Sequence, residues 1–232
     1  MKQIFAAFLM TAMVWISACA QDQKKTELKT ETEKVSYVLG QNVGVSLKQL
    51  ETEIDLAAFI QGLRDTLEGS KPLLTAKEAD GIMQAFSTRR QQEYQKKANQ
   101  ASEKNRLEGM AFLEQNKNKS GVMATASGLQ YEVLQEGSGP QPKATDEVTV
   151  HYRGTLIDGK EFDSSYKRGE PATFRLNQVI SGWTEGVQLM KVGSKYKFCI
   201  PPELAYGERG AGADIGPNCT LVFEVELVAI KK

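Results

Sequence analysis

Histidine is almost missing from this chain of 232 residues, in which His151 is the only one. A Ser-His-Asp hydrolase site or a histidine-rich metal site is therefore not expected. The chain also has no excess of charge of one sign, because 29 Lys and Arg residues balance 29 Asp and Glu residues. This balance argues against nucleic acid as the main partner. The glycine-rich segment from Gly207 to Gly212 lacks the Gly-Lys-Ser/Thr ending of a phosphate-binding loop.

Cysteine is scarce as well, with three residues in the chain. Two of them, Cys199 and Cys219, lie in or beside segments that we predict as strands. An exported protein can form a disulfide, but the distance between the two sulfur atoms does not follow from the sequence. We interpret both as buried small apolar residues, with a disulfide as the alternative.

The first segment of the chain is typical of an export signal. Lys2 precedes a short apolar run, which ends in Ile16-Ser17-Ala18-Cys19. The run is too short to span a bilayer comfortably, so we predict a signal peptide over residues 1–19. The order apolar-Ser-Ala-Cys resembles the bacterial lipobox, which implies that Cys19 is lipidated; ordinary cleavage, with Cys19 incidental, is the alternative. An N-acyl and a diacylglyceryl group together would anchor the protein stably to a membrane.

Residues 20–32 are mostly Gln, Lys, Thr and Glu, with almost no large apolar side chain. Such a segment buries too little surface to order itself, so we predict a flexible tether.

Three helices are predicted in the next part of the chain. Apolar residues at three- and four-residue spacing indicate the first, over residues 33–50. Asp55 can cap the second, and Gly69 ends it. Thr75 and Glu78 form a Thr-x-x-Glu capping box at the start of the third.

The third helix is unusually long, because no proline occurs between Thr75 and Pro140. About forty residues of helix span roughly 60 Å. Its middle, residues 87–106, is almost entirely polar and is predicted to stand in solvent as a stalk. Two helices broken near Asn99 are the alternative, and either way the segment ends between Asn116 and Gly121.

Three helices of this kind bury little apolar surface on their own. We therefore predict an all-α dimerisation domain over residues 33–120 that pairs in a homodimer, with an isolated three-helix unit as the alternative.

A β-hairpin is predicted over residues 148–163. Val148, Val150 and Tyr152 alternate with polar residues, as in a half-buried strand, and Asp158-Gly159 is a strong turn signal. The hairpin brings Tyr152 near Phe162, with Asp163 just beyond. These side chains would form an apolar cup with one polar group.

The rest of residues 121–232 alternates in the same way, with one apolar helix. The expected strands are Leu129–Leu134, Ala172–Leu176, Lys195–Ile200 and Leu221–Leu227, and the expected helix is Trp183–Met190, ended by Gly193. Many strands and one helix indicate an α+β domain with an antiparallel sheet packed on that helix.

Residues 122–232 resemble the FKBP family of peptidyl-prolyl isomerases. The motifs that carry the resemblance are Val150–Gly154, Gly159–Ser165, Val179–Trp183, Ala205-Tyr206-Gly207 and Leu221–Leu227, in the family's order and spacing. The whole layout is similar to the dimeric macrophage infectivity potentiator type. The resemblance implies an FKBP-like sheet wrapped on one short helix, preceded by the helical domain and its long linking helix.

It also implies the activity. The chain would be a peptidyl-prolyl cis–trans isomerase that assists the folding of exported proteins, with no cofactor. Its partners would be unfolded or proline-containing client proteins and, through the lipid anchor, a bacterial membrane. The outer membrane, on its periplasmic or surface side, is the expected location.

The pocket of the family corresponds to ten positions here. The indole of Trp183 would form the floor under the proline ring. The N–H of Ile180 and the hydroxyl of Tyr206 would donate hydrogen bonds to substrate carbonyls, and Asp163 would lie beside the twisting amide. Asp163, Tyr206, Tyr152 and Phe162 are thus the catalytic candidates. The substrate-binding candidates are Trp183, Phe174, Val179, Ile180, Ile215 and Phe223.

Simpler roles exist for some of these residues. Phe174 and Phe223 could be ordinary core, and Asp163 could cap the turn at Ser164 and Ser165. We interpret His151, which points away from Tyr152, as a residue of the sheet face.

The chain also departs from the family pattern. Ser181 replaces a proline, Asp214 stands where an apolar residue is common, and Ile215-Gly216-Pro217 replaces Ile-Pro-Pro. These changes concern mainly the loop over the pocket, residues 208–217, and thus substrate preference and macrolide affinity; the floor and walls match.

Two other functions are compatible with the sequence. A non-catalytic chaperone could use the same cleft to hold unfolded chains, and an adhesion or virulence scaffold would need surface exposure. Prolyl isomerisation needs apolar walls and one or two fixed polar groups, without a nucleophile or metal. Residues 148–223 supply that combination.

Overall fold

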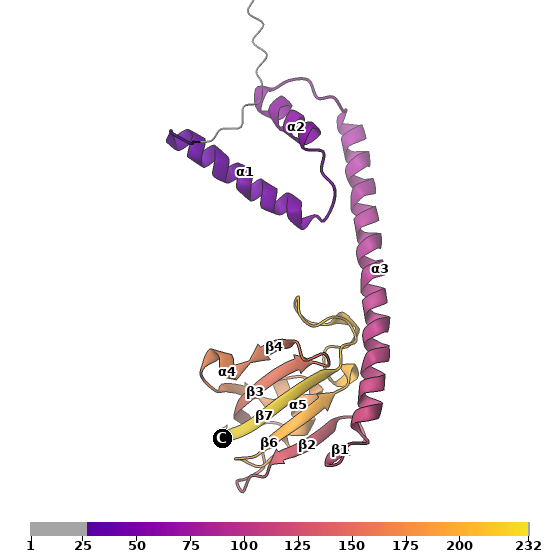
Figure 1. Cartoon of the computed structure of the whole chain (residues 1–232), viewed down its shortest axis with the longest axis vertical. Helices are drawn as coiled ribbons and strands as arrows, with labels where there is room; N and C mark the ends of the chain where they lie inside the picture. Colours follow the sequence, from indigo (N-terminus) through magenta and orange to yellow (C-terminus); the bar gives the residue numbers. More distant parts are fainter. Residues whose placement is uncertain (1–26, 232) are drawn as a thin grey trace, which may run out of the picture. The chain divides into compact units, whose positions relative to one another are not determined.

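The computed structural model describes residues 27–231, which divide between Thr75 and Ala76 into two compact units. The first contains α1 (Glu31–Gln49) and α2 (Leu56–Glu68), and the second contains α3 (Ala76–Asn116) and a seven-stranded sheet (Figure 1). We call residues 117–231, the sheet with its connecting turns, the sheet unit. The predicted signal peptide, the lipidated Cys19 and most of the tether lie outside the described residues.

Both short helices begin at side-chain caps. Thr30 Oγ1 accepts a hydrogen bond from the N–H of Glu33, and the carboxylate of Glu33 accepts one from the N–H of Thr30. This capping box starts α1 two residues earlier than predicted. At α2, the expected cap is confirmed, because Asp55 accepts from the N–H of Ala58 at 3.0 Å. Gly69, with φ of 68°, ends the helix as expected.

The apolar side chains of these two helices are not covered within their own unit. Neither α1 nor α2 contains a buried residue. Val38, Leu39, Leu56 and Leu63 are each at least half exposed. Among the described residues, the first unit therefore presents apolar helix faces that are exposed.

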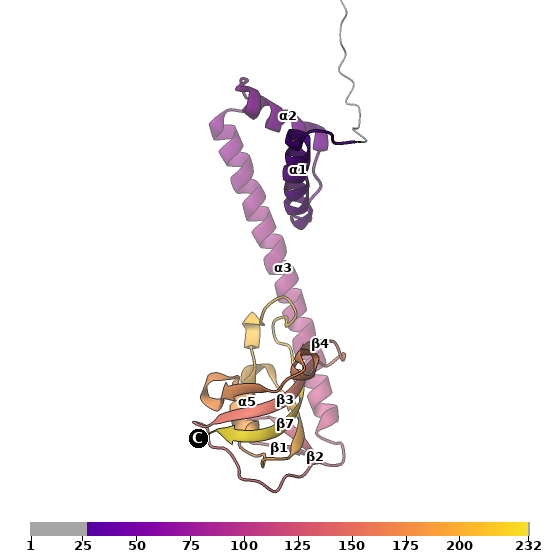
Figure 2. The same ribbon diagram turned by 90° about the vertical axis from the view of Figure 1, so that its left-hand side faces the viewer.

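The third helix is continuous from Ala76 to Asn116, without a break near Asn99. Most residues between 87 and 100 are exposed, as the stalk prediction requires. The prediction is wrong for Ser102 and Asn105, which are half-buried and bonded to the sheet unit. The end of α3 lies beside β2, where Asn116 Nδ2 donates to Gln130 Oε1 at 2.9 Å (Figure 2).

Over residues 27–231, no helix is both long enough and apolar enough to cross a membrane.

The sheet is antiparallel in the order β1-β2-β6-β7-β3-β4, with β5 paired to β3. In β3, Val148, Val150 and Tyr152 are buried and Arg153 is exposed, so the predicted alternation is confirmed. The hairpin is confirmed too, since Arg153 and Gly154 pair with Ser164 and Asp163. The strands are β1 (Val122–Ala124), β2 (Gln130–Gln135), β3 (Glu147–Leu156), β4 (Glu161–Ser164), β5 (Ala172–Arg175), β6 (Lys195–Ile200) and β7 (Leu221–Lys231).

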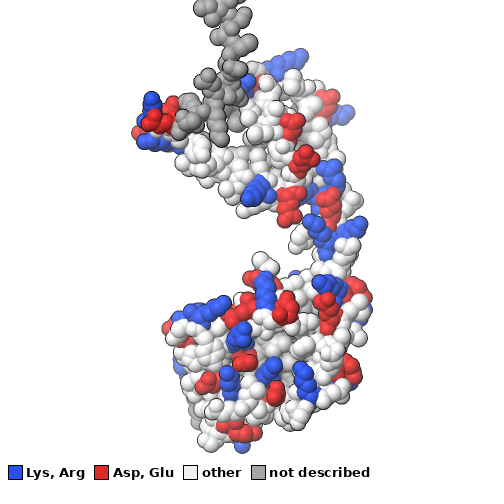
Figure 3. Space-filling view, viewed as in Figure 1, with Lys and Arg blue, Asp and Glu red and all other residues white. Residues whose placement is uncertain are grey.

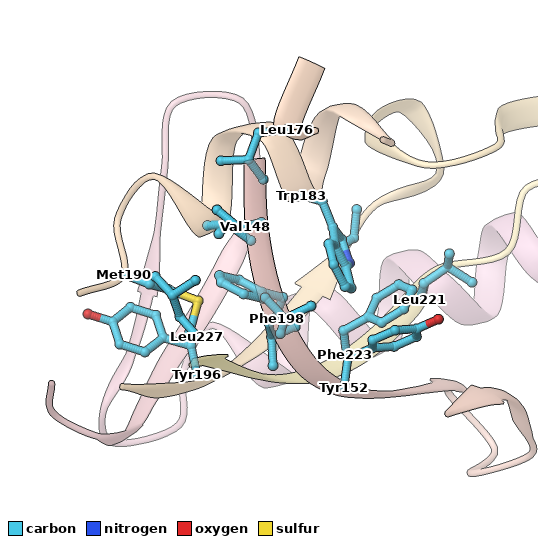
Figure 4. Packing of buried hydrophobic residues seen from close by; sticks show 14 of the residues in the cluster. Val148, Tyr152, Leu176, Trp183, Met190, Tyr196, Phe198, Leu221, Phe223 and Leu227 are labelled. Carbon is cyan, nitrogen blue, oxygen red and sulfur yellow. The ribbon is translucent and has the colours of Figure 1, made fainter. Parts of the chain in front are cut away.

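One short helix, α5 (Ser181–Val187), contributes Val187 and Trp183 to the core of the sheet, and Figure 4 shows Trp183 there. It is shorter than predicted, because the N–H groups of Leu189 and Met190 bond to carbonyls three residues back in a tight turn. Gly193 does not end this helix. It lies in the turn before β6, where its φ is 87° and its N–H donates to Leu227 O.

Smaller helical turns connect these elements. They are α4 (Ser165–Arg168), η1 (Leu176–Gln178), η2 (Pro202–Leu204) and η3 (Gly207–Arg209). On the face drawn in Figure 3, Lys and Arg side chains are interspersed with Asp and Glu side chains over the sheet unit, in keeping with the balanced composition.

Candidate active site

The sheet unit contains a hollow of about 590 Å³ whose walls are mainly aromatic. Every residue that the FKBP resemblance placed in the pocket lines it. Gln178, which the sequence did not indicate, lines it too. The lining residues are Tyr152, Phe162, Asp163, Phe174, Gln178, Val179, Ile180, Trp183, Tyr206, Ile215 and Phe223.

Separate parts of the fold supply these side chains. Tyr152 comes from β3, Phe162 and Asp163 from β4, Phe174 from β5, and Phe223 from β7. The helix α5, its N-terminal flank and the loops around η3 supply the remainder. The pocket therefore depends on four strands, β3, β4, β5 and β7, and no single hairpin forms it.

Trp183 lies beside Tyr152 and Phe223 (Figure 4). Its ring is 4% exposed and makes edge-on contacts with Tyr152, Phe174 and Phe223, with centroid distances of 5.2, 5.7 and 5.3 Å. Edge-to-face pairs at these distances are favourable beyond their buried area. Its Nε1 is buried and has no hydrogen-bond partner in the described part of the chain. Ring packing, without a polar contact, thus holds the indole in place.

Gly154 allows two other rings to meet. It pairs with Phe223 across β3 and β7 and with Asp163 across β3 and β4. A Cβ at this position would lie 2.7 Å from ring atoms of both Phe162 and Phe223. The bare backbone therefore makes room for the edge-on contact between Phe162 and Phe223, whose centroids are 5.5 Å apart.

The polar group at the pocket wall is a closed network of three side chains. The hydroxyl of Tyr152 donates to Asp163 Oδ2 at 2.5 Å, and Arg168 Nη1 donates to Asp163 Oδ1 at 2.5 Å. Arg168 Nη2 also donates to the hydroxyl of Tyr152 at 2.7 Å, and its guanidinium lies 5.4 Å from the centroid of that ring. Both oxygens of the carboxylate are thus held in one orientation.

The network also sets two protonation states. Burial acts to raise the pKa of Asp163, but the hydrogen bonds from Tyr152 and Arg168 prevail and lower it below its ordinary value. Burial raises the pKa of Tyr152, and the bond to Asp163 adds to that effect. At neutral pH the carboxylate is therefore charged, and the phenol keeps its proton.

The structure distinguishes between these roles and the simpler ones. Ser164, and not Asp163, caps the following turn by accepting from the N–H of Lys167. Phe223 belongs both to the core and to the pocket wall, since it is 5% exposed and lines the hollow. Phe174 is half-buried against the core and also lines the hollow.

His151 lies outside the lining of the hollow. Its ring stacks on Tyr166, with centroids 4.8 Å apart, and its Nδ1 lies 3.1 Å from Ser165 Oγ. Cys199 is buried, Cys219 is half-buried, and both are free thiols.

Arg168 is the member of the network that sequence analysis missed. It follows Asp163 by five residues, in the short helix α4. Its signal is weak, because an isolated arginine after a turn resembles any solvated charge. Tyr206, in contrast, lies at the start of η3, lines the hollow and is 41% exposed.

Comparisons with known proteins agree with this geometry. Residues 139–228 match the family model described as FKBP-type peptidyl-prolyl cis-trans isomerase, and residues 32–133 match the domain amino terminal to that isomerase. The two models meet near residues 133–139, whereas the compact units divide at Thr75, so the predicted domain boundaries remain a prediction.

Relatives match over nearly their full length. The chain is 40% identical to the outer membrane protein MIP of Legionella longbeachae, covering all of this chain and 98% of that protein. It is 43% identical to the peptidyl-prolyl cis-trans isomerase Mip of Coxiella burnetii, with full coverage of both. The crystal structure of FkpA from Escherichia coli superposes with a TM-score of 0.67 at 40% identity, covering 88% of this chain and 99% of that one.

Proposed function

Since this chain belongs to the FKBP-type peptidyl-prolyl cis–trans isomerases, we infer that it rotates X-Pro amide bonds in the aromatic hollow around Trp183. The observation that carries the assignment of the site is the combination of edge-packed rings with one fixed, charged network, Tyr152–Asp163–Arg168. No bond of the substrate breaks in this reaction, so the site needs neither nucleophile nor metal.

The chemistry follows from the resonance of the amide. Rotation is opposed by a barrier of about 18–20 kcal/mol, because the planar form is stabilised by delocalised charge. Water stabilises that charge further. A hollow lined by Trp183, Phe162, Phe174 and Phe223 excludes water from the bound peptide, so the planar form loses its solvation.

Fixed polar groups then favour the twisted form. We assign the floor under the proline ring to Trp183. The N–H of Ile180 and the hydroxyl of Tyr206 are assigned as donors to substrate carbonyls. Asp163 faces the twisting amide, and because Tyr152 and Arg168 hold it, it needs no reorganisation during the reaction.

The decisive experiment compares two tyrosines that differ only in location. Tyr206→Phe removes the hydroxyl at the hollow, and Tyr166→Phe removes a hydroxyl that contacts Glu226 on the sheet face. In a protease-free prolyl isomerisation assay, Tyr206→Phe should lower kcat/KM by about tenfold, which corresponds to the loss of one neutral hydrogen bond. Tyr166→Phe should retain wild-type rates.

The same assay tests the chaperone alternative. Negligible catalysis by the wild-type chain, together with undiminished suppression of client aggregation in Tyr206→Phe and Asp163→Ala, would contradict the isomerase assignment. It would leave a binding module that uses the cleft alone.

We also propose that the first unit forms a homodimer. The exposed apolar faces of α1 and α2 support it, since an uncovered surface of this kind is costly in water. Sedimentation of residues 20–232 should give a dimer at micromolar concentration. Leu39→Glu should yield monomers, whereas Gln41→Glu, on an exposed polar position of the same helix, should not. A wild-type monomer would contradict the proposal.

Finally, we propose that the chain resides in the bacterial envelope, anchored through Cys19. The support is the lipobox-like sequence and the relative that is named an outer membrane protein. Labelled palmitate should be incorporated into the wild-type protein and lost in Cys19→Ser. Equal labelling of both would exclude Cys19 as the lipidated residue.

A further inference from the structure

The loop over the pocket is a closed segment that is anchored at its base. Between residues 207 and 218 the chain leaves and returns to one point, where the N–H of Asn218 donates to Gly207 O at 2.8 Å. Near the tip, Ala211 and Ile215 exchange two backbone hydrogen bonds, of 2.8 and 3.1 Å. The tip places Ile215, which is 8% exposed, in the lining of the hollow.

The base of this loop rests on α3. Asn105 Nδ2 donates to Pro217 O at 2.8 Å, and Asn218 Nδ2 donates to Ser102 Oγ at 2.8 Å. One turn further, Gly109 is buried, and a Cβ there would collide with Oγ1 of Thr220. Ser102, Asn105 and Gly109 are three and four residues apart, so they form one stripe of the helix, which we name the docking stripe.

The loop residues fit this stripe closely. Asn218 has φ of 54°, a left-handed backbone that few residues other than glycine adopt readily. Its side chain and its backbone N–H are both used, one on Ser102 and one on Gly207. A Cβ at Gly216 would lie 3.2 Å from Asn105 Nδ2, so the glycine at this position, a departure from the family pattern, leaves room for Asn105.

We propose that Ser102 and Asn105 are positioning residues for the isomerase pocket. They lie on the long helix and not in the pocket, and they hold the base of the loop so that Ile215 stays at the pocket wall. Through Ile215, they set which residues beside the proline are accepted. The proposal rests on the function proposed above for the hollow.

The experiment uses the complete chain and four variants. Asn105→Asp keeps the side-chain volume but replaces the amide donor by an acceptor facing Pro217 O. Ser102→Ala removes the acceptor of Asn218, and Ser102→Thr retains it. Lys104→Ala is the matched control, because Lys104 lies on the same helix turn with a side chain that is 71% exposed and pairs with Glu108 at 3.9 Å.

Two quantities are measured: kcat/KM over peptides that differ in the residue before proline, and the methyl resonance of Ile215. Asn105→Asp and Ser102→Ala should lower kcat/KM by about three- to tenfold, the range expected for one part-buried hydrogen bond. They should also change the ratio between peptides and shift the Ile215 resonance. Ser102→Thr and Lys104→Ala should match wild type in all three respects.

A purely structural role would lower the melting temperature without altering the ratio between peptides or the Ile215 resonance, and that result would overturn the proposal. If Asn105→Asp does not fold, the comparison of Ser102→Ala with Ser102→Thr decides. A wild-type chain without isomerase activity would contradict the proposed function instead. The Ile215 resonance would then decide alone, and an unchanged resonance in Ser102→Ala would overturn the positioning role.

Discussion

Tyr152 and Asp163 belong to neighbouring strands, and a hydrogen bond of 2.5 Å joins the phenol of one to the carboxylate of the other. Arg168 closes the triangle from α4. The pocket wall thus contains a charge whose position and protonation are both fixed before a substrate arrives. Substitution of single members of this network should therefore have measurable effects.

The first prediction concerns the pH dependence of this charge. The pKa of Asp163 is lower in the folded chain than its ordinary value of about 3.9, so its ionisation stabilises the fold above about pH 4. That contribution is lost as the pH falls through the folded pKa. Because Arg168 lowers this pKa, Arg168→Gln should raise it, as a carboxyl carbon NMR titration would detect.

A matched control lies one residue away. Lys167 pairs with Glu161 at 2.9 Å and not with Asp163, so Lys167→Gln should leave the pKa of Asp163 unchanged. Equal titration curves for Arg168→Gln and Lys167→Gln would show that Arg168 has no influence on the carboxylate.

The second prediction concerns glycine-to-alanine substitutions in α3, which should have opposite effects on stability at two positions. Alanine normally stabilises a helix over glycine by about 0.5–1 kcal/mol. Gly81→Ala, in α3 with nothing within 4 Å of an added Cβ, should follow this rule. Gly109→Ala should instead destabilise the chain by about 1–3 kcal/mol, because its Cβ would press on Thr220. Thermal and urea unfolding would measure both.

Removal of the obstructing atom is the corresponding test. The double variant Gly109→Ala with Thr220→Ala should recover part of the lost stability, since Oγ1 of Thr220 is the nearest atom to the added Cβ. Additive losses from the two changes would argue against a direct collision.

The third prediction concerns the space beside the pocket rings. Gly154→Ala would force the rings of Phe162 and Phe223 apart, because its Cβ would lie 2.7 Å from both. We expect a loss of about 1–3 kcal/mol in the free energy of unfolding, together with reduced kcat/KM. Unaltered stability and rates would mean that the rings relax without cost, contrary to this description of the wall.

The fourth prediction distinguishes the two free thiols. Cys199 is 2% exposed, and burial raises its pKa to about 11. Its thiolate fraction at pH 8 is then about one in a thousand, so iodoacetamide should modify it only when the chain unfolds. Cys219 is half-buried and should react faster in the folded protein. Peptide mass spectrometry over time would follow the modification of both thiols. Equal rates for Cys199 and Cys219 would contradict this difference in burial.

The sheet and pocket were predictable because their signals are local or motif-based. The alternation around Tyr152 fixed which side chains face the core, and Asp158-Gly159 located the hairpin. The order of the FKBP motifs then indicated which distant residues meet at Trp183. The end of α5 was not predictable from Gly193, because a glycine marks a turn without saying which element it follows.

Contacts of α3 with the sheet unit escaped sequence analysis for a different reason. Hydrophobic periodicity detects helix faces made of large apolar residues, and the docking stripe is made of Ser102, Asn105 and Gly109. Small and polar residues at helical spacing look like solvent-facing positions. The partners in the loop, more than a hundred residues away, give no local signal either.

The composition of the docking stripe also determines the free energy needed to separate α3 from the loop. Hydroxyl and amide groups that leave Asn218 and Pro217 find equivalent partners in water, unlike leucines or valines pulled from a core. The contact between α3 and the loop can therefore open and form again without exposing a large apolar surface to which other proteins would bind.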